Sequence, residues 1–152
     1  MGEPEYVPRF SGDKRELVQR WDTIQYVPIL STIERLFHDE GIVEQIYSFP
    51  KRIRNDNKME DFCDGNLFKN HPIFSTDPLA LQIIAYYDEL ELCNPLGTHV
   101  KQHKLGLVFF SLGNIHPKYR SSYKAIYLAI AAPSKVIEKH GLNTVLQPLL
   151  VI

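Results

Sequence analysis

Three acidic residues follow a strongly apolar segment near the middle of the chain. Residues 81–87, LQIIAYY, are mostly aliphatic and aromatic, and Asp88, Glu89 and Glu91 come at their end. The segment predicts a β-strand, along which successive side chains point to opposite faces. Carboxylates at a strand end are often only hydrated, but on a rigid strand they can also hold Mg²⁺ against a phosphodiester. The residues alone favour the first interpretation, in which these carboxylates are only hydrated.

A second set of potential metal ligands lies just downstream. Cys93, His99 and His103 have the spacing C-x5-H-x3-H. A closed structural zinc site needs four ligands and usually includes two closely spaced cysteines, an arrangement that this chain lacks. Zinc is therefore an alternative hypothesis that needs a further ligand from a distant part of the chain.

Basic and aromatic residues are interleaved around the predicted connections between strands. The basic residues are Lys101, Lys104, Lys118, Arg120 and Lys124, and the aromatic ones are Tyr119 and Tyr123. Such a patch can contact phosphates and stack bases, which would make it a nucleic-acid or protein binding surface. An ordinary solvated surface is the other interpretation, because the net charge of −1 provides no global attraction for nucleic acid.

Hydrophobic spacing and turn residues predict the elements that carry these groups. A helix is expected from Asp13 to Pro28, with Leu17, Trp21 and Ile24 on one face. Further helical segments are expected between Leu30 and Gly41 and around residues 42–46. Strands are expected at 80–92, 103–115 and 123–132, followed by helices at 134–141 and from 142 onward.

This order of elements predicts an α/β or α+β fold in two parts. Residues 1–60 are expected to form a small helical N-terminal region, and residues 61–152 a sheet of about three strands followed by helices. A chain of 152 residues suits one globular domain with a small appendage.

The sequence contains no apolar run near the roughly 20 residues that span a bilayer, and its N-terminus lacks the pattern of a signal peptide. The two cysteines are far apart and form no CxxC pair. We therefore expect an intracellular protein in a reducing compartment, without a membrane partner.

The run from Asp61 to Ala129 resembles proteins encoded by DNA transposons of animal genomes and, more distantly, the CACTA-type transposase domain of plants. The matching elements are Asp64-Gly65 with Phe68, the strand Leu81–Asp88, the turn Asn94–Gly97, the strand Leu105–Phe110 and the segment LGNIHPKYRS, 112–121. In the plant pattern Gly-Phe-Asn-Pro follows the Asp closely, whereas here residues 89–93 intervene. Glu89 and Glu91 are therefore rivals of Asp88 as the ancestral ligand.

The resemblance implies a ribonuclease-H-like fold in which an acidic triad binds two divalent metals. Asp88 would be the first acid, Mg²⁺ or Mn²⁺ the cofactor of an intact ancestor, DNA the partner, and the nucleus the location if the ancestral role is kept. The elements that carry the second and third acids would follow residue 152. We therefore expect a truncated transposase-derived fragment, with no cofactor and no catalytic activity of its own.

A sheet of about three strands should also leave one edge uncovered. Residues 105–110, LGLVFF, are apolar, uncharged and free of proline, so we expect them to be the exposed outer strand. Self-association through that edge is the corresponding expectation.

Overall fold

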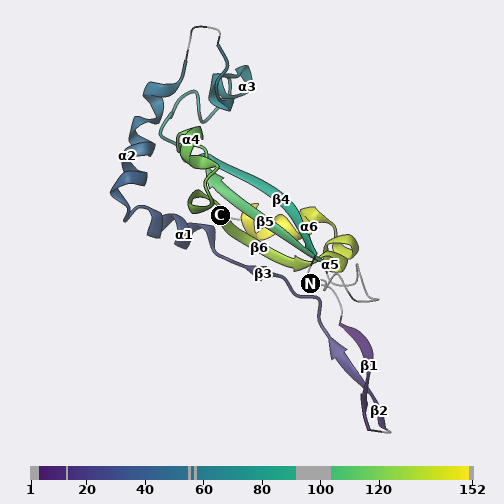
Figure 1. The fold of residues 1–152 in the computed structure, drawn as a ribbon. Helices are drawn as coiled ribbons and strands as arrows, with labels where there is room; N and C mark the ends of the chain where they lie inside the picture. The colour runs from purple at the N-terminus through teal and green to yellow at the C-terminus, as the bar shows by residue number, and fades with distance from the viewer. Residues whose placement is uncertain (1–3, 13, 55, 57, 92–103, 151–152) are drawn as a thin grey trace. The chain divides into compact units, whose positions relative to one another are not determined.

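The computed structural model describes residues 4–12, 14–54, 56, 58–91 and 104–150 (Figure 1). The helices are α1 (Ile29–Leu36), α2 (Glu40–Ser48), α3 (Asn66–Lys69), α4 (Pro117–Arg120), α5 (Ser134–His140) and α6 (Leu142–Leu150), with 3-10 turns η1 (Phe49–Arg52), η2 (Phe62–Asp64) and η3 (Tyr123–Ala125). The strands are β1 (Glu5–Ser11), β2 (Lys14–Arg20), β3 (Gln25–Tyr26), β4 (Ile83–Glu91), β5 (Lys104–Leu112) and β6 (Tyr127–Pro133). The fold is of the α+β class, as predicted.

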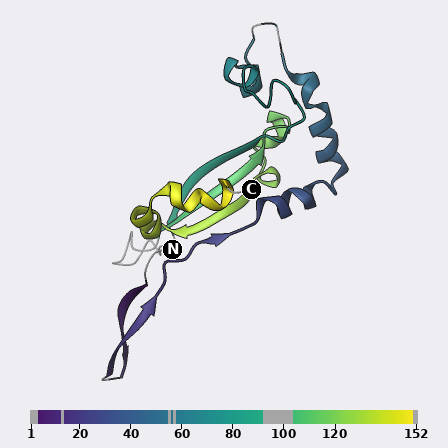
Figure 2. The same cartoon turned by 180° about the vertical axis from the view of Figure 1, so that it is seen from behind.

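The larger sheet has the strand order β3-β6-β5-β4 (Figures 1 and 2). β4, β5 and β6 follow one another in the chain and lie side by side in the sheet, so the three predicted strands are present. The short β3 adds to β6 in antiparallel register, with Gln25 opposite Ala131. Among the described residues, β3 and β4 are therefore the edge strands.

β5 supplies much of the buried apolar surface of this sheet. Val108, Phe110 and Leu112 alternate along it and are at most 2% exposed. The ring of Phe110 lies 5.4 Å from that of Tyr127 on β6. The expectation that Leu105–Phe110 forms an uncovered outer strand is wrong, because β5 lies between β6 and β4. The strand that lies at this edge is β4.

A β-hairpin replaces the helix expected after Asp13. β1 pairs with β2 in antiparallel register from Glu5 opposite Arg20 to Ser11 opposite Lys14. Gly12 has φ +61°, a left-handed conformation that glycine adopts without steric cost. The helical prediction was wrong because the spacing of Leu17 and Trp21 was weighed without the Gly-Asp pair before them, which is a typical two-residue hairpin turn.

The helical segments expected between Leu30 and residue 46 are present with different ends. α1 begins directly after Pro28, and Asp39 caps α2 by accepting hydrogen bonds from the N–H groups of Gly41 and Ile42. Gly41 therefore lies in the first turn of α2 and does not end the preceding helix. No helix in the described ranges is long and apolar enough to cross a membrane.

The contacts between residues divide the chain into two compact units. Unit 1 comprises residues 1–26, 88–107 and 130–152, and unit 2 comprises residues 27–87 and 108–129. The boundary expected between residues 60 and 61 is not one of these division points, and the two-part domain organisation stays a prediction.

Unit 2 contains an aromatic core under its 3-10 turns. Phe49, Cys63 and Phe68 are buried together, with Ile53 and Phe74 packed against them. The rings of Phe49 and Phe68 meet edge to face at 5.9 Å, and those of Phe68 and Phe74 stack at 5.2 Å. Aromatic pairs of this kind add stabilisation beyond the area they bury.

Candidate functional site

Strand β4 carries all three acidic residues singled out in the sequence. The strand continues to Glu91, so Asp88 projects from a paired strand and not from a loop. The side chains of Asp88, Glu89 and Glu91 are exposed. The Asp88 carboxylate accepts a hydrogen bond from the backbone N–H of Glu89, with 2.8 Å between Oδ1 and N. Asp88 is therefore on a rigid element and accessible to a ligand from solvent.

Asp88 and the two glutamates lie on opposite faces of β4. The Tyr86 ring stacks on Phe109 of β5 at 5.6 Å, and Asp88, two residues further, shares the face of Tyr86. Glu89 and Glu91 point to the other face, where Lys104 Nζ lies 3.4 Å from Glu89 Oε2. Either glutamate could replace Asp88 as a ligand, but neither can join it at one metal ion.

The described residues contain no group of three or more His, Cys, Asp or Glu side chains placed to hold a metal ion. Asp88 can thus supply one ligand from the part of the chain that is described. The alternative zinc ligands Cys93, His99 and His103 lie outside the described residues, as does Lys101.

In the part of the chain that the structure describes, two residues of the predicted basic patch are paired with carboxylates. Lys104 belongs to unit 1 and pairs with Glu89, whereas residues 118–124 belong to unit 2. Arg120 is engaged by an acidic partner, described next. Lys118 and Lys124 are exposed, and Lys118 Nζ lies 5.6 Å from the centre of the Tyr119 ring. The available part of the patch is therefore a short segment of α4 and η3.

An ion pair that was not predicted from the sequence joins two of the motifs that carry the family resemblance. Arg120 donates from Nη2 to Asp61 Oδ1 at 2.7 Å and from Nη1 to Asp61 Oδ2 at 3.1 Å, with both side chains less than one-fifth exposed. Nη1 also donates to the carbonyl of Gly113 at 3.1 Å, and the guanidinium lies 5.2 Å from the centre of the Phe62 ring. This two-point pairing connects the turn before Asp64-Gly65 to the LGNIHPKYRS segment.

Buried polar side chains hold the same two segments in place. The Asp64 carboxylate accepts from the backbone N–H groups of Glu60, Asp61 and Arg54, and these bonds lower its pKa. Asn114 is fully buried, accepts from the N–H of Gln82 at 2.9 Å and donates to the carbonyl of Ala80 at 3.2 Å. The spacing Asp61-x-x-Asp64 is a capping pattern that could have predicted the first of these turns.

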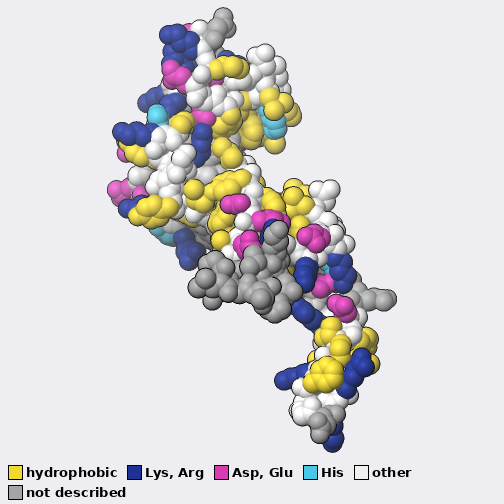
Figure 3. Space-filling model, turned by 45° about the vertical axis from the view of Figure 1, so that its right-hand side comes forward, with side chains coloured by type: hydrophobic (Ala, Val, Ile, Leu, Met, Phe, Trp, Pro, Cys, Tyr) yellow, Lys and Arg dark blue, Asp and Glu magenta, His cyan; other side chains and the backbone are white. Residues whose placement is uncertain are grey.

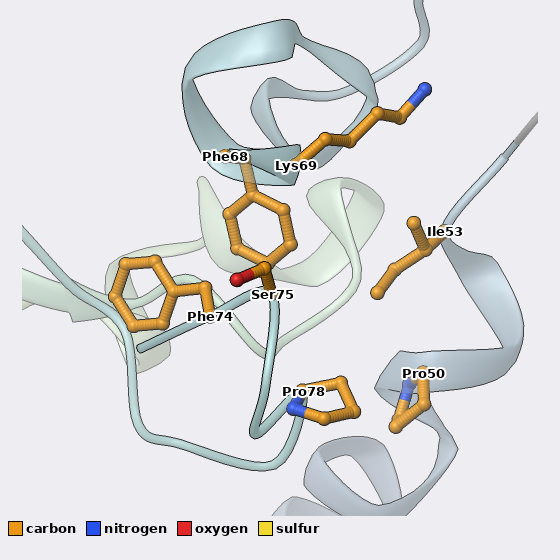
Figure 4. A pocket seen from close by; sticks show the side chains of 7 residues that line it. All are labelled: Pro50, Ile53, Phe68, Lys69, Phe74, Ser75 and Pro78. Atoms are coloured by element: carbon orange, nitrogen blue, oxygen red, sulfur yellow. The ribbon is translucent and has the colours of Figure 1, made fainter. Parts of the chain in front are cut away.

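Unit 2 also has a pocket of about 470 Å³ beside its aromatic core, with a lining of mixed polar and apolar character. Figure 4 shows the residues that line it, which are Pro50, Ile53, Phe68, Lys69, Phe74, Ser75 and Pro78. The Ser75 hydroxyl donates to the carbonyl of His71 at 2.6 Å. The described lining holds no pairing of a nucleophile with a base, so it offers no acyl-transfer or hydrolytic chemistry.

A neighbouring cavity of about 480 Å³ contains Arg52, Cys63 and His116 among its lining residues. Burial raises the pKa of the Cys63 thiol, which keeps it protonated and weakly nucleophilic. Burial lowers the pKa of Arg52, whose guanidinium donates to the carbonyl of Asn114 and to the Gln45 side chain. Arg52 and Cys63 therefore have structural roles at this cavity.

Comparison of the chain with protein-family models, with curated proteins and with solved structures found no match.

Proposed function

We propose that this chain derives from a DNA transposase and that its second half is part of a ribonuclease-H-like domain. The observation that carries the proposal is the position of Asp88, exposed on β4. β4 is the first strand of the consecutive series β4-β5-β6, and the helices α5 and α6 follow that series. This is the order of elements that the sequence resemblance implies, with the first acid on the first strand.

The contact between Asp61 and Arg120 joins two of the motifs that carry the resemblance. The two residues are 59 positions apart, and each lies in or beside one of the motifs on which the resemblance depends. Because the two residues bind each other, the two motifs depend on one another in the folded structure.

The described residues do not by themselves fit a two-metal centre. Two-metal phosphoryl transfer needs several carboxylates around a pair of ions about 4 Å apart. The face of β4 that carries Asp88 adds Ile84, Tyr86 and Leu90 from the same strand, none of which is a carboxylate. We therefore assign Asp88 the role of a single hard oxygen ligand and expect no DNA cleavage by the chain alone.

A plasmid-nicking assay with Mg²⁺ or Mn²⁺ tests this assignment. The wild-type chain and Asp88→Asn should both leave supercoiled DNA intact, with Glu91→Gln as a control for loss of a nearby charge. Metal-dependent nicking by the wild type that disappears in Asp88→Asn would overturn the inactive assignment, because loss of one member of an acidic triad costs several orders of magnitude in rate.

A second candidate function is a binding module at residues 118–124. It is favoured by the exposure of Tyr119 (51%) and Tyr123 (81%) next to Lys118 and Lys124. Exposed aromatic side chains beside cations can stack bases and contact phosphates. The double variant Lys118→Gln/Lys124→Gln should then weaken binding to DNA and flatten its dependence on salt. An unchanged affinity would remove this candidate.

A further inference from the structure

The register of the β1–β2 hairpin gives it two chemically different faces. Directly opposed residues of an antiparallel pair lie on the same face. The face that we call the aromatic face consists of the pairs Tyr6–Gln19, Pro8–Leu17 and Phe10–Arg15. The other face, called the charged face, consists of Glu5–Arg20, Val7–Val18, Arg9–Glu16 and Ser11–Lys14.

Charge is distributed unevenly between these faces. On the charged face, Arg9 stands opposite Glu16 and Arg20 opposite Glu5, so each carboxylate has a cation beside it. The three described pairs of the aromatic face contain no carboxylate, and their one charge is the Arg15 guanidinium. A partner of the aromatic face therefore meets positive charge without a competing acid.

The large side chains of the aromatic face are open to solvent. Tyr6 is 62% exposed, Phe10 71% and Leu17 65%. Figure 3 shows hydrophobic and basic side chains gathered over this ribbon. A two-stranded hairpin alone buries too little surface to be stable in water, so a bound partner would stabilise it.

We propose that the aromatic face binds single-stranded nucleic acid, with bases stacked on Tyr6 and Phe10. Each ring lies directly opposite a polar side chain: Arg15 beside Phe10 can pair with a phosphate, and Gln19 beside Tyr6 can bond a base edge. Aromatic platforms beside cations are how proteins bind single strands without sequence preference.

The size of the face fits this ligand. Tyr6 and Phe10 are four residues apart on one strand, which corresponds to about 13 Å at the usual rise of about 3.3 Å per residue. A stacked strand advances about 3.4 Å per nucleotide, so the two rings span about four nucleotides. This site is separate from Asp88 and from residues 118–124, and it does not depend on the proposed transposase origin.

Fluorescence anisotropy with a labelled oligothymidine tests the proposal on the full chain. Arg15→Gln should weaken binding and reduce the slope of log Kd against log salt by about 0.7, the value for one phosphate contact on a single strand. Arg9→Gln removes the same charge from the charged face and is the matched control, which should keep the wild-type slope. Phe10→Ala should raise Kd about tenfold, the size of a lost stacking contact.

Val7→Ala on the charged face is the control for Phe10→Ala, and circular dichroism verifies that each variant is folded. If loss of the Phe10 ring in Phe10→Ala disturbs the hairpin, the comparison of Arg15→Gln with Arg9→Gln still tests the proposal by itself. Equal effects of the two arginine variants would overturn the proposal in favour of general electrostatics.

Two further results would also overturn it. Loss of binding only in Lys118→Gln/Lys124→Gln would place the nucleic acid at the other surface. Loss of self-association in Phe10→Ala, measured by sedimentation with DNA affinity unchanged, would make a second copy of the chain the occupant.

Discussion

At the scale of single residues, the buried amide of Asn114 connects residues 112–121 to the segment that precedes β4. Its side chain accepts from Gln82 N–H and donates to the Ala80 carbonyl, and it is 0% exposed. Asn114→Ala should lower the free energy of unfolding of unit 2 by about 1–3 kcal/mol, because the Gln82 donor is left buried without a partner. Denaturant unfolding measures this, with the exposed Asn66→Ala as control. A change below about 0.5 kcal/mol would contradict the assigned role.

The sequence predicted some of these residues and missed others for a physical reason. Asp88 was singled out because strand patterning and a carboxylate are local signals, and its role as a metal ligand stays a prediction. Asp61 and Arg120 were not paired in advance, because they are 59 residues apart and only the tertiary fold brings them together. The exposure of β4 was also missed, since a run of apolar residues does not reveal whether its strand is central or at an edge.

At the scale of elements, the hairpin turn depends on the left-handed backbone of Gly12, φ +61°. Gly12→Ala should cost the hairpin about 1–2 kcal/mol, the usual penalty for an L-residue in that region. Gly12→Asn should cost less, because asparagine tolerates this conformation. Hydrogen exchange of the amides in residues 5–20 measures the local opening. Equal protection in wild type and Gly12→Ala would show that the turn does not need glycine.

Strands β4, β5 and β6 of the larger sheet were predictable, whereas β3 and the N-terminal hairpin were not. β5 and β6 were recovered because their apolar residues are bounded by clear turn residues. Residues 13–24 satisfy a helical spacing as well, and the competing hairpin signal consists of Gly12-Asp13 alone. Pairing with β1 favours the strand over the helix for these residues, and this pairing depends on another segment of the chain.

At the scale of the whole molecule, an ionic contact links the segment after the hairpin to α5. Lys139 Nζ lies 2.6 Å and His140 Nε2 2.9 Å from Asp22 Oδ2. Two hydrogen bonds lower the pKa of Asp22 from 3.8 to about 2, and the bond from Lys139 has the larger effect, ahead of the bond from His140. Since the folded pKa is below the unfolded one, this stabilisation is complete above about pH 4 and is lost as the pH falls toward 2.

Asp22→Asn should therefore destabilise the protein at neutral pH and have little effect near pH 2. Unfolding curves between pH 2 and 7 measure the difference from wild type, and Glu138→Gln in α5 is the control for loss of an exposed carboxylate. A destabilisation that is the same at both ends of the pH range would show that the ion pair does not account for it.

We propose that Asp88 binds a divalent metal ion as the first acid of a transposase-type strand. Substoichiometric Mn²⁺ broadens NMR signals near its binding site, so the most direct measurement is the broadening of amide signals along β4 in wild type and variants. We expect broadening around Asp88 that is abolished by Asp88→Asn and retained in the double variant Glu89→Gln/Glu91→Gln. Broadening that survives Asp88→Asn but disappears in the double variant would contradict the claim.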